Sequence, residues 1–284
     1  MPSILIIGGD SAIGAEAARA FHLRGWEVAK TTRRPGASGR DRLDLAEPLS
    51  GWPDLPPCDV ALVLAAVTSG AAVAANPKRA KLINVERTGT LIRQLQQNGT
   101  FVLFPSTSLV FSGDDPFPAE ASPVAPLSPY AEHKVRIERL IEHGAVLRLT
   151  KVLMPTLPLL RGWHEQLSCG NAIKAFGNLP LAPVSLDDAV AGLVSIATSR
   201  RQGIFHLSGD RDISYRDVAL ALAEAAGAPS VLVRSAQADA ISLGLQKIPR
   251  HGALGMARTQ AQLGLAPRPV ESVIASVVAE FRSN

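Results

Sequence analysis

The chain has 284 residues, of which 46% are hydrophobic and 19% are charged, and its formal net charge is +4. This composition is typical of a well-packed folded protein and not of a disordered one. Lys and Arg residues are scattered along the chain instead of forming runs, so no nucleic-acid partner and no membrane-surface partner is expected.

Two cysteines, Cys58 and Cys169, lie far apart and outside any Cys/His cluster. This spacing disfavours a disulfide framework and a zinc site, so we expect no metal. The N-terminal residues lack a charged leader, and the apolar stretch at residues 60–75 is too short and too interrupted to cross a bilayer. The expected location is the cytoplasm.

Short apolar runs alternate with amphipathic segments along the first half of the chain. Strands are expected at residues 4–7, 26–31, 60–65, 101–104 and 145–152. Helices are expected at residues 15–24, at residues 76–99 and from Ser128-Pro129 onward, because a capping residue followed by Pro is a typical helix start. The side chains expected to face the core are Ala17, Ala20, Phe21, Leu82, Val85, Ile92 and Leu95. Strands separated by helices indicate an α/β fold with a doubly wound parallel (Rossmann) sheet.

The pattern changes after Pro155, where an irregular region is expected around Trp163 and Phe176. A helix at 187–199, a strand at 203–207 and a helix at 215–226 follow. We predict a dinucleotide-binding domain at residues 1–153, with residues 184–208 returning to it. Residues 154–183 and 209–284 are expected to form a small C-terminal substrate lobe.

A glycine-rich loop, Gly-Gly-Asp-Ser-Ala-Ile-Gly at residues 8–14, joins the first predicted strand to the first predicted helix. In this context, backbone N–H groups and the helix N-terminus can receive a pyrophosphate. Gly8 is expected to form the tight turn and Gly14 to allow close packing, while Ser11 takes the place of the usual third glycine. A plain strand-to-helix turn is the alternative. The cofactor-binding residues expected in the loop are Gly8, Gly9, Ser11, Ala12, Ile13 and Gly14.

The end of the second predicted strand indicates which dinucleotide binds. A ribose-binding carboxylate is expected there, about 20 residues beyond the loop, but residues 28–40 contain none. Instead the strand ends in Thr32, Arg33 and Arg34. Because guanidinium groups suit a 2′-phosphate, the predicted cofactor is NADP(H) and less so NAD(H). Two solvent-exposed loop arginines are the alternative.

The segment that begins at Ser128 places Tyr130 and Lys134 one helical turn apart, so their polar ends share a helix face. Alone, such a pair is more often a surface feature than a catalytic one. Thr107 follows the strand at 101–104, at the sheet edge where such folds build their sites. Together with the glycine loop, this favours the catalytic interpretation.

Several motifs occur in a fixed order: the glycine loop, INVERTGT at 83–90, FPSTSLVFSG at 104–113, Tyr130-x-x-x-Lys134, LRLTKV at 147–152, PVSLDDA at 183–189 and GIFHLSGDRDISYRDVA from 203. This ordered set covers almost the whole chain and resembles the extended short-chain dehydrogenases/reductases. STSLVFSG at 106–113 and GMARTQAQLGL at 255–265 are most similar to the dTDP-4-dehydrorhamnose reductase branch.

The resemblance implies that Tyr130 is the general acid/base, that Lys134 binds the nicotinamide ribose and that Thr107 hydrogen-bonds the substrate oxygen. A nearby ammonium group and an oxidised nicotinamide are expected to bring the pKa of the phenol down toward neutral pH. Asn84 is implied in a proton relay through water, and a buried Asn that bridges backbone groups is the alternative. The further residues expected around the cofactor are Asp44, Leu64, Ala65 and Ala66, where Asp44 is equally compatible with an ordinary polar loop.

On the substrate side, Ser106-Thr107-Ser108-Leu109 stands where the resembled branch has Ser-Thr-Asp-Tyr. The missing acidic residue after Thr107 disfavours water elimination. Ser108, Trp163 and His164 are expected to line the substrate pocket, and a core position is the alternative for Trp163.

These features favour an NADP-dependent oxidoreductase that reduces a carbonyl of a keto-sugar, either free or linked to a nucleotide. The alternatives are a sugar-nucleotide epimerase and a catalytically silent NADP(H)-binding redox sensor. The expected partner is a small sugar or sugar nucleotide, and a homodimer remains open.

Overall fold

The computed structural model describes residues 1–34 and 41–282, and the chain divides into two compact units. The first unit contains Met1–Val110, Ser128–Arg148 and Val190–Phe205. The second contains Phe111–Leu127, Leu149–Ala189 and the residues from His206 onward. The chain therefore enters each unit more than once.

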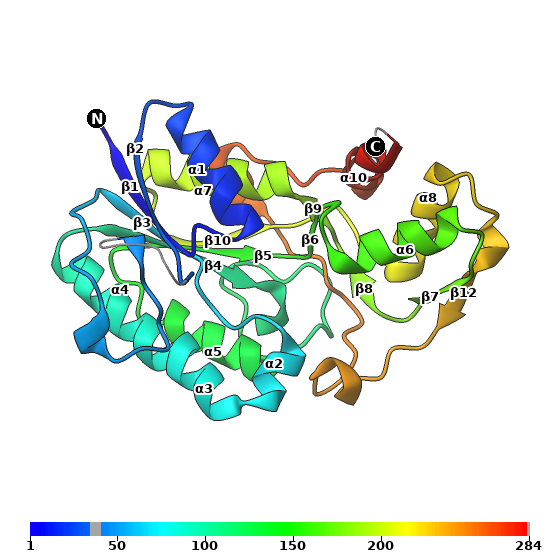
Figure 1. Ribbon diagram of the computed structural model, residues 1–284, viewed down its shortest axis with the longest axis horizontal. Coiled ribbons are helices and arrows are strands. Elements are labelled where there is room, and N and C mark those ends of the chain that lie inside the picture. The colour runs from blue at the N-terminus through cyan, green and yellow to red at the C-terminus, as the bar shows by residue number, and fades with distance from the viewer. Residues whose placement is uncertain (35–40, 283–284) are drawn as a thin grey trace. The chain divides into compact units, whose positions relative to one another are not determined.

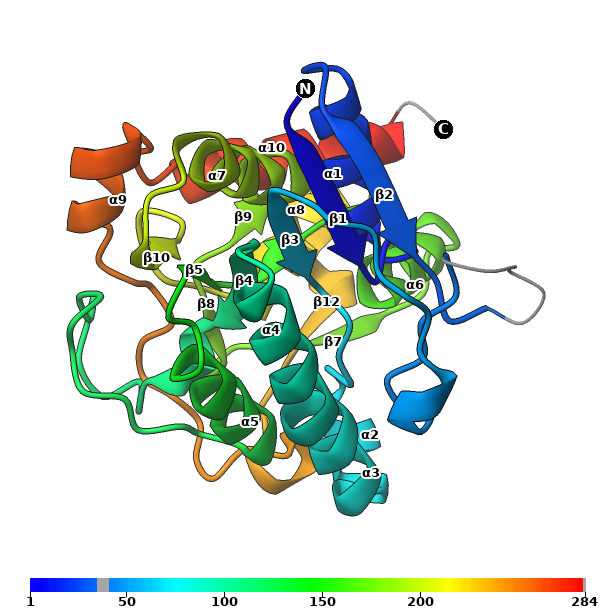
Figure 2. The same cartoon turned by 90° about the vertical axis from the view of Figure 1, so that its left-hand side faces the viewer.

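The first unit is built on a six-stranded sheet with the strand order β10-β5-β4-β3-β1-β2. The strands are β1 (Ser3–Ile7), β2 (Glu27–Thr31), β3 (Val60–Val63), β4 (Phe101–Thr107), β5 (Gly144–Leu149) and β10 (Gly203–Leu207). β1 pairs in parallel with both β2 and β3, so the chain reverses its direction of winding beside β1 (Figure 2). This confirms the predicted doubly wound α/β fold, in which ligands bind at the carboxyl ends of the strands beside such a reversal.

Helices cover both faces of this sheet, which explains why its strands are nearly continuous apolar runs (Figure 1). On one face lie α1 (Ala12–His22) and α7 (Leu186–Ser199), and on the other lie α4 (Thr88–Gln97) and α5 (Pro129–Glu138). As predicted, α1 buries Ala17, Ala20 and Phe21, together with Gly14.

The helix predicted at residues 76–99 begins as expected but is not regular. The Asn76 side chain accepts a hydrogen bond of 3.0 Å from the Arg79 backbone N–H and so caps α3 (Pro77–Lys81). A π-helical segment, η3 (Leu82–Arg87), then separates α3 from α4. The wider turn changes which side chains face inward: Asn84 is buried, while Leu82 and Val85 are only half-buried. Of the four side chains predicted to face the core in this segment, Ile92 and Leu95 are buried as predicted, and Leu82 and Val85 are only partly so.

Two further predictions need correction. The strand predicted at 145–152 is interrupted at Thr150 and continues as β6 (Val152–Leu153). There the Thr150 N–H donates to the Leu207 carbonyl oxygen at 3.1 Å. The region expected to be irregular around Trp163 and Phe176 contains α6 (Pro158–Ser168) and β7 (Ile173–Phe176), because Pro158 begins a helix and does not break one.

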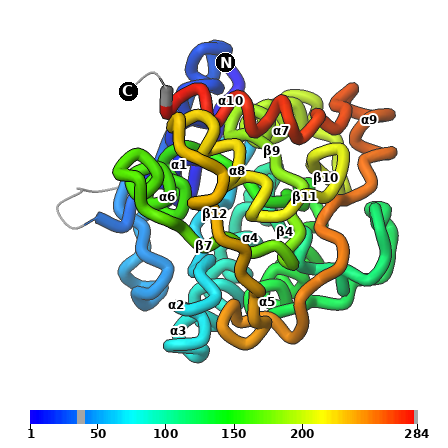
Figure 3. Tube along the Cα trace, turned by 90° about the vertical axis from the view of Figure 1, so that its right-hand side faces the viewer, coloured from blue at the N-terminus to red at the C-terminus, as the bar shows by residue number. Residues whose placement is uncertain are grey.

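The core of the second unit lies among α6, α8 (Tyr215–Ala225) and α10 (Val270–Arg282), beside the paired strands β7 and β12 (Val233–Ala236) (Figure 3). The remaining elements of the chain are α2 (Gly70–Ala75), β8 (Pro180–Leu181), β9 (Val184–Ser185), β11 (Ile213–Ser214), α9 (Ala257–Leu263) and the 3-10 turns Leu49–Gly51, Ser108–Val110, Ser230–Leu232 and Ile241–Leu243. In the described part of the chain, no helix has both the length and the apolar character that a membrane span requires.

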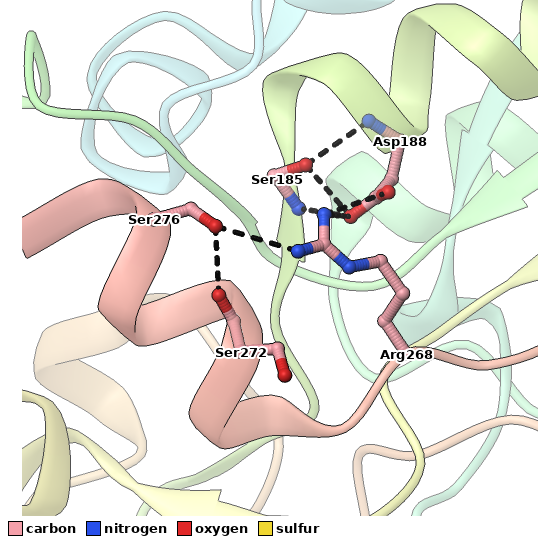
Figure 4. A network of polar contacts seen from close by, with 5 residues as sticks. All are labelled: Ser185, Asp188, Arg268, Ser272 and Ser276. Atoms are coloured by element: carbon pink, nitrogen blue, oxygen red, sulfur yellow. Dashed lines mark hydrogen bonds and ion pairs between the residues drawn. The ribbon is translucent and has the colours of Figure 1, made fainter. Parts of the chain in front are cut away.

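The PVSLDDA motif forms the start of α7 (Figure 4). The Asp188 carboxylate accepts hydrogen bonds from the Ser185 N–H at 3.1 Å and from the Ser185 hydroxyl at 2.7 Å, and Ser185 in turn caps the Asp188 N–H at 3.0 Å. Arg268 donates to Asp188 at 3.1 Å and to the Ser276 hydroxyl on α10 at 3.4 Å. These contacts explain the motif by helix capping and by the attachment of α10, without any ligand.

Candidate functional site

The glycine loop connects β1 to α1 through a closely packed turn. Gly8 has a φ of +89°, and a Cβ atom at Gly14 would lie only 2.7 Å from the Gly8 carbonyl oxygen. Ser11 caps α1, since its hydroxyl accepts from the Gly14 N–H at 3.0 Å and donates to the Gly8 carbonyl at 3.0 Å. The serine in the place of the third glycine thus holds the first and last glycines together. The positive end of the α1 dipole opens at this loop.

A cleft of about 290 Å³ lies beside the loop, at the carboxyl ends of β1, β2 and β3. This volume is close to the lower end of the range for small-molecule sites. Of the predicted cofactor residues, those lining the cleft are Gly8, Ser11, Thr32, Arg33, Asp44, Leu64, Ala65 and Ala66. Gly9, Ala12, Ile13, Gly14 and Arg34 are not among its lining residues. Asp44 lines the cleft, and its carboxylate accepts from the Ala46 N–H at 2.9 Å within a turn.

A carboxylate does reach the end of β2, but it comes from the glycine loop. The Thr32 hydroxyl donates to the Asp10 carboxylate, and Nε of Arg34 lies 3.5 Å from Oδ2 of Asp10. Asp10 lies outside residues 28–40, where the ribose-binding carboxylate was expected from the sequence. The available signal was strand adjacency, because β1 and β2 pair in parallel with Ile7 opposite Thr31, so the residues after both strands meet.

The Tyr130 and Lys134 side chains lie on α5, whose start is capped by the Ser128 hydroxyl accepting from the Ala131 N–H at 3.2 Å. Nζ of Lys134 donates to the Pro105 carbonyl oxygen at 2.7 Å and lies 4.2 Å from the centre of the Phe104 ring. The distance from Nζ to the centre of the Tyr130 ring is 5.8 Å. The helix spacing therefore brings the phenol and the ammonium group to the same part of β4.

A second, smaller cavity of about 10 Å³ has room for about one water molecule. The residues that line it are Ala65, Ala66, Asn84, Thr88, Phe104, Tyr130, His133 and Lys134. Ala65 and Ala66 line both cavities, so the second lies next to the cleft beside the glycine loop. Thr107 is not in this set; it ends β4, and its hydroxyl accepts from the Leu109 N–H at 3.3 Å.

Burial controls the protonation of this pair. It raises the pKa of Tyr130 to about 12, and it lowers the pKa of Lys134 to about 8 against the attraction of Glu138. For Tyr130 this is opposite to the direction expected from the sequence, because desolvation of a phenolate outweighs an ammonium group 5.8 Å from the ring centre. Tyr130 consequently keeps its proton at neutral pH.

Asn84 bridges backbone groups, which was the alternative to a proton relay. Its side chain accepts from the Val67 N–H at 2.7 Å and donates to the Val67 carbonyl at 2.8 Å. Nδ2 of Asn84 also lies 3.5 Å from Nδ1 of His133, a buried residue that the sequence analysis did not consider. Burial lowers the pKa of His133, and Arg136 and Lys81 add to this effect against Glu132. The signal that identifies His133 is its position one turn after Tyr130.

Glu138 continues the helix face of Tyr130 and Lys134 by one more turn. Its carboxylate pairs with Arg148 on β5, with Nη2 of Arg148 2.7 Å from Oε2, and accepts from the Ser106 hydroxyl on β4. Only 5% of the Glu138 side chain and 3% of the Arg148 side chain are exposed. This pair was not predicted from the sequence, although Glu138 follows Tyr130 at a spacing of two helical turns. The network fastens α5 to the two strands beneath it.

The residues expected around the substrate have different environments. Ser108 is half-buried directly after Thr107 in the first unit. In the second unit, Trp163 is buried in the core between α6 and α8, which was its alternative role. The His164 ring packs against Phe281 with 4.8 Å between ring centres. Among residues 1–34 and 41–282, no three His, Cys, Asp or Glu side chains form a group suited to a metal ion.

Comparison with known proteins shows the family of this chain. The family model described as the RmlD substrate binding domain matches residues 1–283. A curated relative, methionine adenosyltransferase 2 subunit beta of Xenopus tropicalis, is 26% identical over 255 residues, which are 81% of this chain and 74% of the relative.

Solved structures share the fold. The dTDP-4-dehydrorhamnose reductase of Yersinia enterocolitica has a TM-score of 0.84 at 21% identity and covers 99% of this chain and 100% of its own. The enzyme of the same name from Bacillus anthracis str. Ames, in complex with NADP, has a TM-score of 0.83 at 15% identity, with 99% of each chain covered. UDP-glucose 4-epimerase of Thermus thermophilus, in complex with NAD, has a TM-score of 0.80 at 20% identity, also with 99% of each chain covered.

Proposed function

Because this chain belongs to the RmlD substrate binding domain family, we propose that it reduces the carbonyl of a keto-sugar with NADPH. One observation carries the proposal: the cavity lined by Tyr130 and Lys134 shares Ala65 and Ala66 with the cleft at the glycine loop. A dinucleotide cleft and a proton donor are therefore adjacent at one sheet edge.

The residues present fit a dinucleotide. A Cβ atom at Gly8 would lie 2.9 Å from the Ala65 backbone nitrogen, so only glycine leaves the loop open at this point. The N-terminus of α1 offers N–H groups and a positive dipole end to a pyrophosphate. Arg33 lines the cleft at the end of β2, where it can meet a 2′-phosphate. The similar structures in complex with NADP and with NAD hold cofactors of the same class.

The chain's own side chains would supply binding, orientation and the proton. Bound NADPH supplies a hydride for the carbonyl carbon. Tyr130, protonated at neutral pH because its pKa is raised to about 12, donates its proton to the carbonyl oxygen. The Thr107 hydroxyl hydrogen-bonds the same oxygen as negative charge develops there.

Lys134 is the residue we assign to the ribose of the nicotinamide half. An ammonium group has three N–H donors. One N–H group of Lys134 donates to the Pro105 carbonyl oxygen at 2.7 Å, and its other N–H groups can donate to the ribose hydroxyl groups. Asn84 supports this site by fixing the Val67 backbone beside Ala66.

We further propose that the substrate is linked to a nucleotide, in line with the names of the dTDP-4-dehydrorhamnose reductases. Ser108 follows Thr107 and would contact the sugar. As regards organisation, we propose that residues 1–153 with 184–208 bind the dinucleotide, and that residues 154–183 and 209–284 form the substrate lobe.

The test is NADPH oxidation, followed by absorbance, against 4-keto sugar nucleotides and simple ketones. The chain contains two tyrosines, so Tyr215→Phe is a matched control for Tyr130→Phe. We expect Tyr130→Phe to lower turnover by about 10²- to 10⁴-fold with NADPH affinity retained, and Tyr215→Phe to remain near the parent rate. Equal turnover by the parent and Tyr130→Phe would exclude Tyr130 as the proton donor.

A second candidate follows from the name of the curated relative, a subunit of methionine adenosyltransferase. On this alternative the chain binds NADP(H) without turnover and associates with a methionine adenosyltransferase. NADPH binding in the absence of oxidation by any carbonyl compound, together with co-elution with such an enzyme, would favour it over the reductase. Cofactor that stays bound through purification and is not consumed would favour an epimerase.

A further inference from the structure

The end of β2 carries both signs of charge. Arg33 and Arg34 follow the strand, while the Asp10 carboxylate arrives from the glycine loop and accepts a hydrogen bond from the Thr32 hydroxyl. Asp10, Thr32 and Arg33 line the same cleft. We propose that Asp10 sets the preference of this chain between NADP(H) and NAD(H) by opposing the two arginines, an inference that rests on the proposed dinucleotide function.

The contacts explain why Asp10 acts on this position. Oδ2 of Asp10 lies 3.5 Å from Nε of Arg34, so the carboxylate partly neutralises the positive charge of that guanidinium group. The backbone N–H of Arg34 donates to the Thr32 hydroxyl oxygen at 3.1 Å, so hydrogen bonds connect Arg34, Thr32 and Asp10. The Asp10 side chain lines the cleft and is 39% exposed, and Arg34, which is 76% exposed, adjoins the cleft through its ion pair with Asp10.

NADP(H) and NAD(H) interact differently with the negative charge of Asp10. A 2′-phosphate is an anion, so it competes with Asp10 for Arg34 and is repelled by the carboxylate. A ribose 2′-hydroxyl can instead donate a hydrogen bond to a carboxylate at the end of β2. Asp10 therefore weakens the NADP(H) preference that Arg33 and Arg34 alone would give. If Asp10 instead served only to orient Arg34 for the phosphate, removal of the Asp10 charge would lower the ratio of NADPH affinity to NADH affinity.

The experiment measures equilibrium binding and not turnover. Calorimetric titrations of NADPH, NADH, 2′,5′-ADP and 5′-AMP compare the parent chain with Asp10→Asn, which keeps an oxygen to accept the Thr32 hydroxyl. We expect Asp10→Asn to raise the ratio of NADPH affinity to NADH affinity about tenfold at low salt, and less at high salt because the effect is electrostatic. The ratio of 2′,5′-ADP to 5′-AMP affinity should change in parallel. An unchanged or lower ratio would overturn the inference.

Two further variants test the cause. Asp54→Asn removes an exposed carboxylate of the first unit and should leave the ratio unchanged, which controls for net charge. Arg34→Ala should reduce the increase when it is combined with Asp10→Asn, because the released guanidinium group is then absent and only the loss of the carboxylate's own effect on the 2′-position remains; an increase as large in the double variant as in Asp10→Asn alone counts against the proposal. Absence of binding by all four ligands would remove the proposed function together with this inference, whereas binding with an unchanged ratio removes the inference alone.

Discussion

Lys134 and Pro105 are joined by a buried hydrogen bond, in which the ammonium group donates to the carbonyl oxygen at 2.7 Å. The bond holds α5 against β4 two residues before Thr107, so the same cation that we assign to the cofactor ribose also positions the helix that carries Tyr130. Burial lowers the pKa of Lys134, so keeping its ammonium group charged at this position costs folding free energy.

The first prediction concerns stability against pH. The pKa of Lys134 falls from 10.5 to about 8 on folding, so above about pH 8 the unfolded chain binds more protons than the folded chain and stability rises with pH. Lys134→Met lacks this rise. The parent should therefore gain on the order of 1–3 kcal/mol relative to Lys134→Met between about pH 7 and about pH 10.

Denaturant unfolding of both proteins across this range measures the difference. The series ends near pH 10 because the raised pKa of Tyr130, about 12, has the opposite effect above the ordinary phenol value of 10.0. A difference in unfolding free energy that does not change with pH would contradict the buried charged state of Lys134.

The second prediction concerns the buried pair Glu138–Arg148. Removal of one partner leaves an uncompensated charge, so Glu138→Leu and Arg148→Met should each cost about 3–5 kcal/mol of unfolding free energy. The double variant should cost less than the sum by at least about 2 kcal/mol, since no lone charge remains. As a control, Glu47→Gln at the more solvent-accessible Arg42–Glu47 pair, where both side chains are 34% exposed, should cost far less. Additive costs at the buried pair would argue against direct coupling.

The third prediction concerns Asn84 and the π-helical segment. Asn84→Ala removes the side chain that hydrogen-bonds both the N–H and the carbonyl group of Val67. It should lower the unfolding free energy by about 1–3 kcal/mol. Gln97→Ala, at an exposed position of α4, should change it by less than about 0.5 kcal/mol. Thermal unfolding of the two variants gives the comparison. Equal stability would mean that Val67 does not depend on the Asn84 side chain.

The fourth prediction uses two glycines in helices. Gly14→Ala should destabilise the chain and weaken dinucleotide binding, because the added Cβ would lie 2.7 Å from the Gly8 carbonyl oxygen. Gly162→Ala on α6 meets no atom within 4 Å and should stabilise the chain by about 0.5–1 kcal/mol. Melting temperatures and nucleotide titrations test both. Equal changes at the two positions would show that the glycine loop tolerates a side chain.

The amino-acid sequence by itself determined the features that depend on local chemistry. Apolar runs and amphipathic segments gave the order of strands and helices, and Asn76 and Ser128 marked helix starts, because caps act within one turn. The spacing of Tyr130 and Lys134 was likewise fixed by the period of one helix.

Only the tertiary structure decided which residues from distant segments meet. The pairing of β1 with β2 brings Asp10 to Thr32, and the packing of α5 on β5 brings Glu138 to Arg148, so neither contact lies within one helix or one strand. The burial of Trp163 depends on packing between α6 and α8, and the π-helical turn that turns Asn84 inward departs from the regular period that a sequence pattern assumes. The raised pKa of Tyr130 also depends on the tertiary structure. Desolvation of the phenol is set by all the atoms packed around it and not by its neighbour one helical turn away.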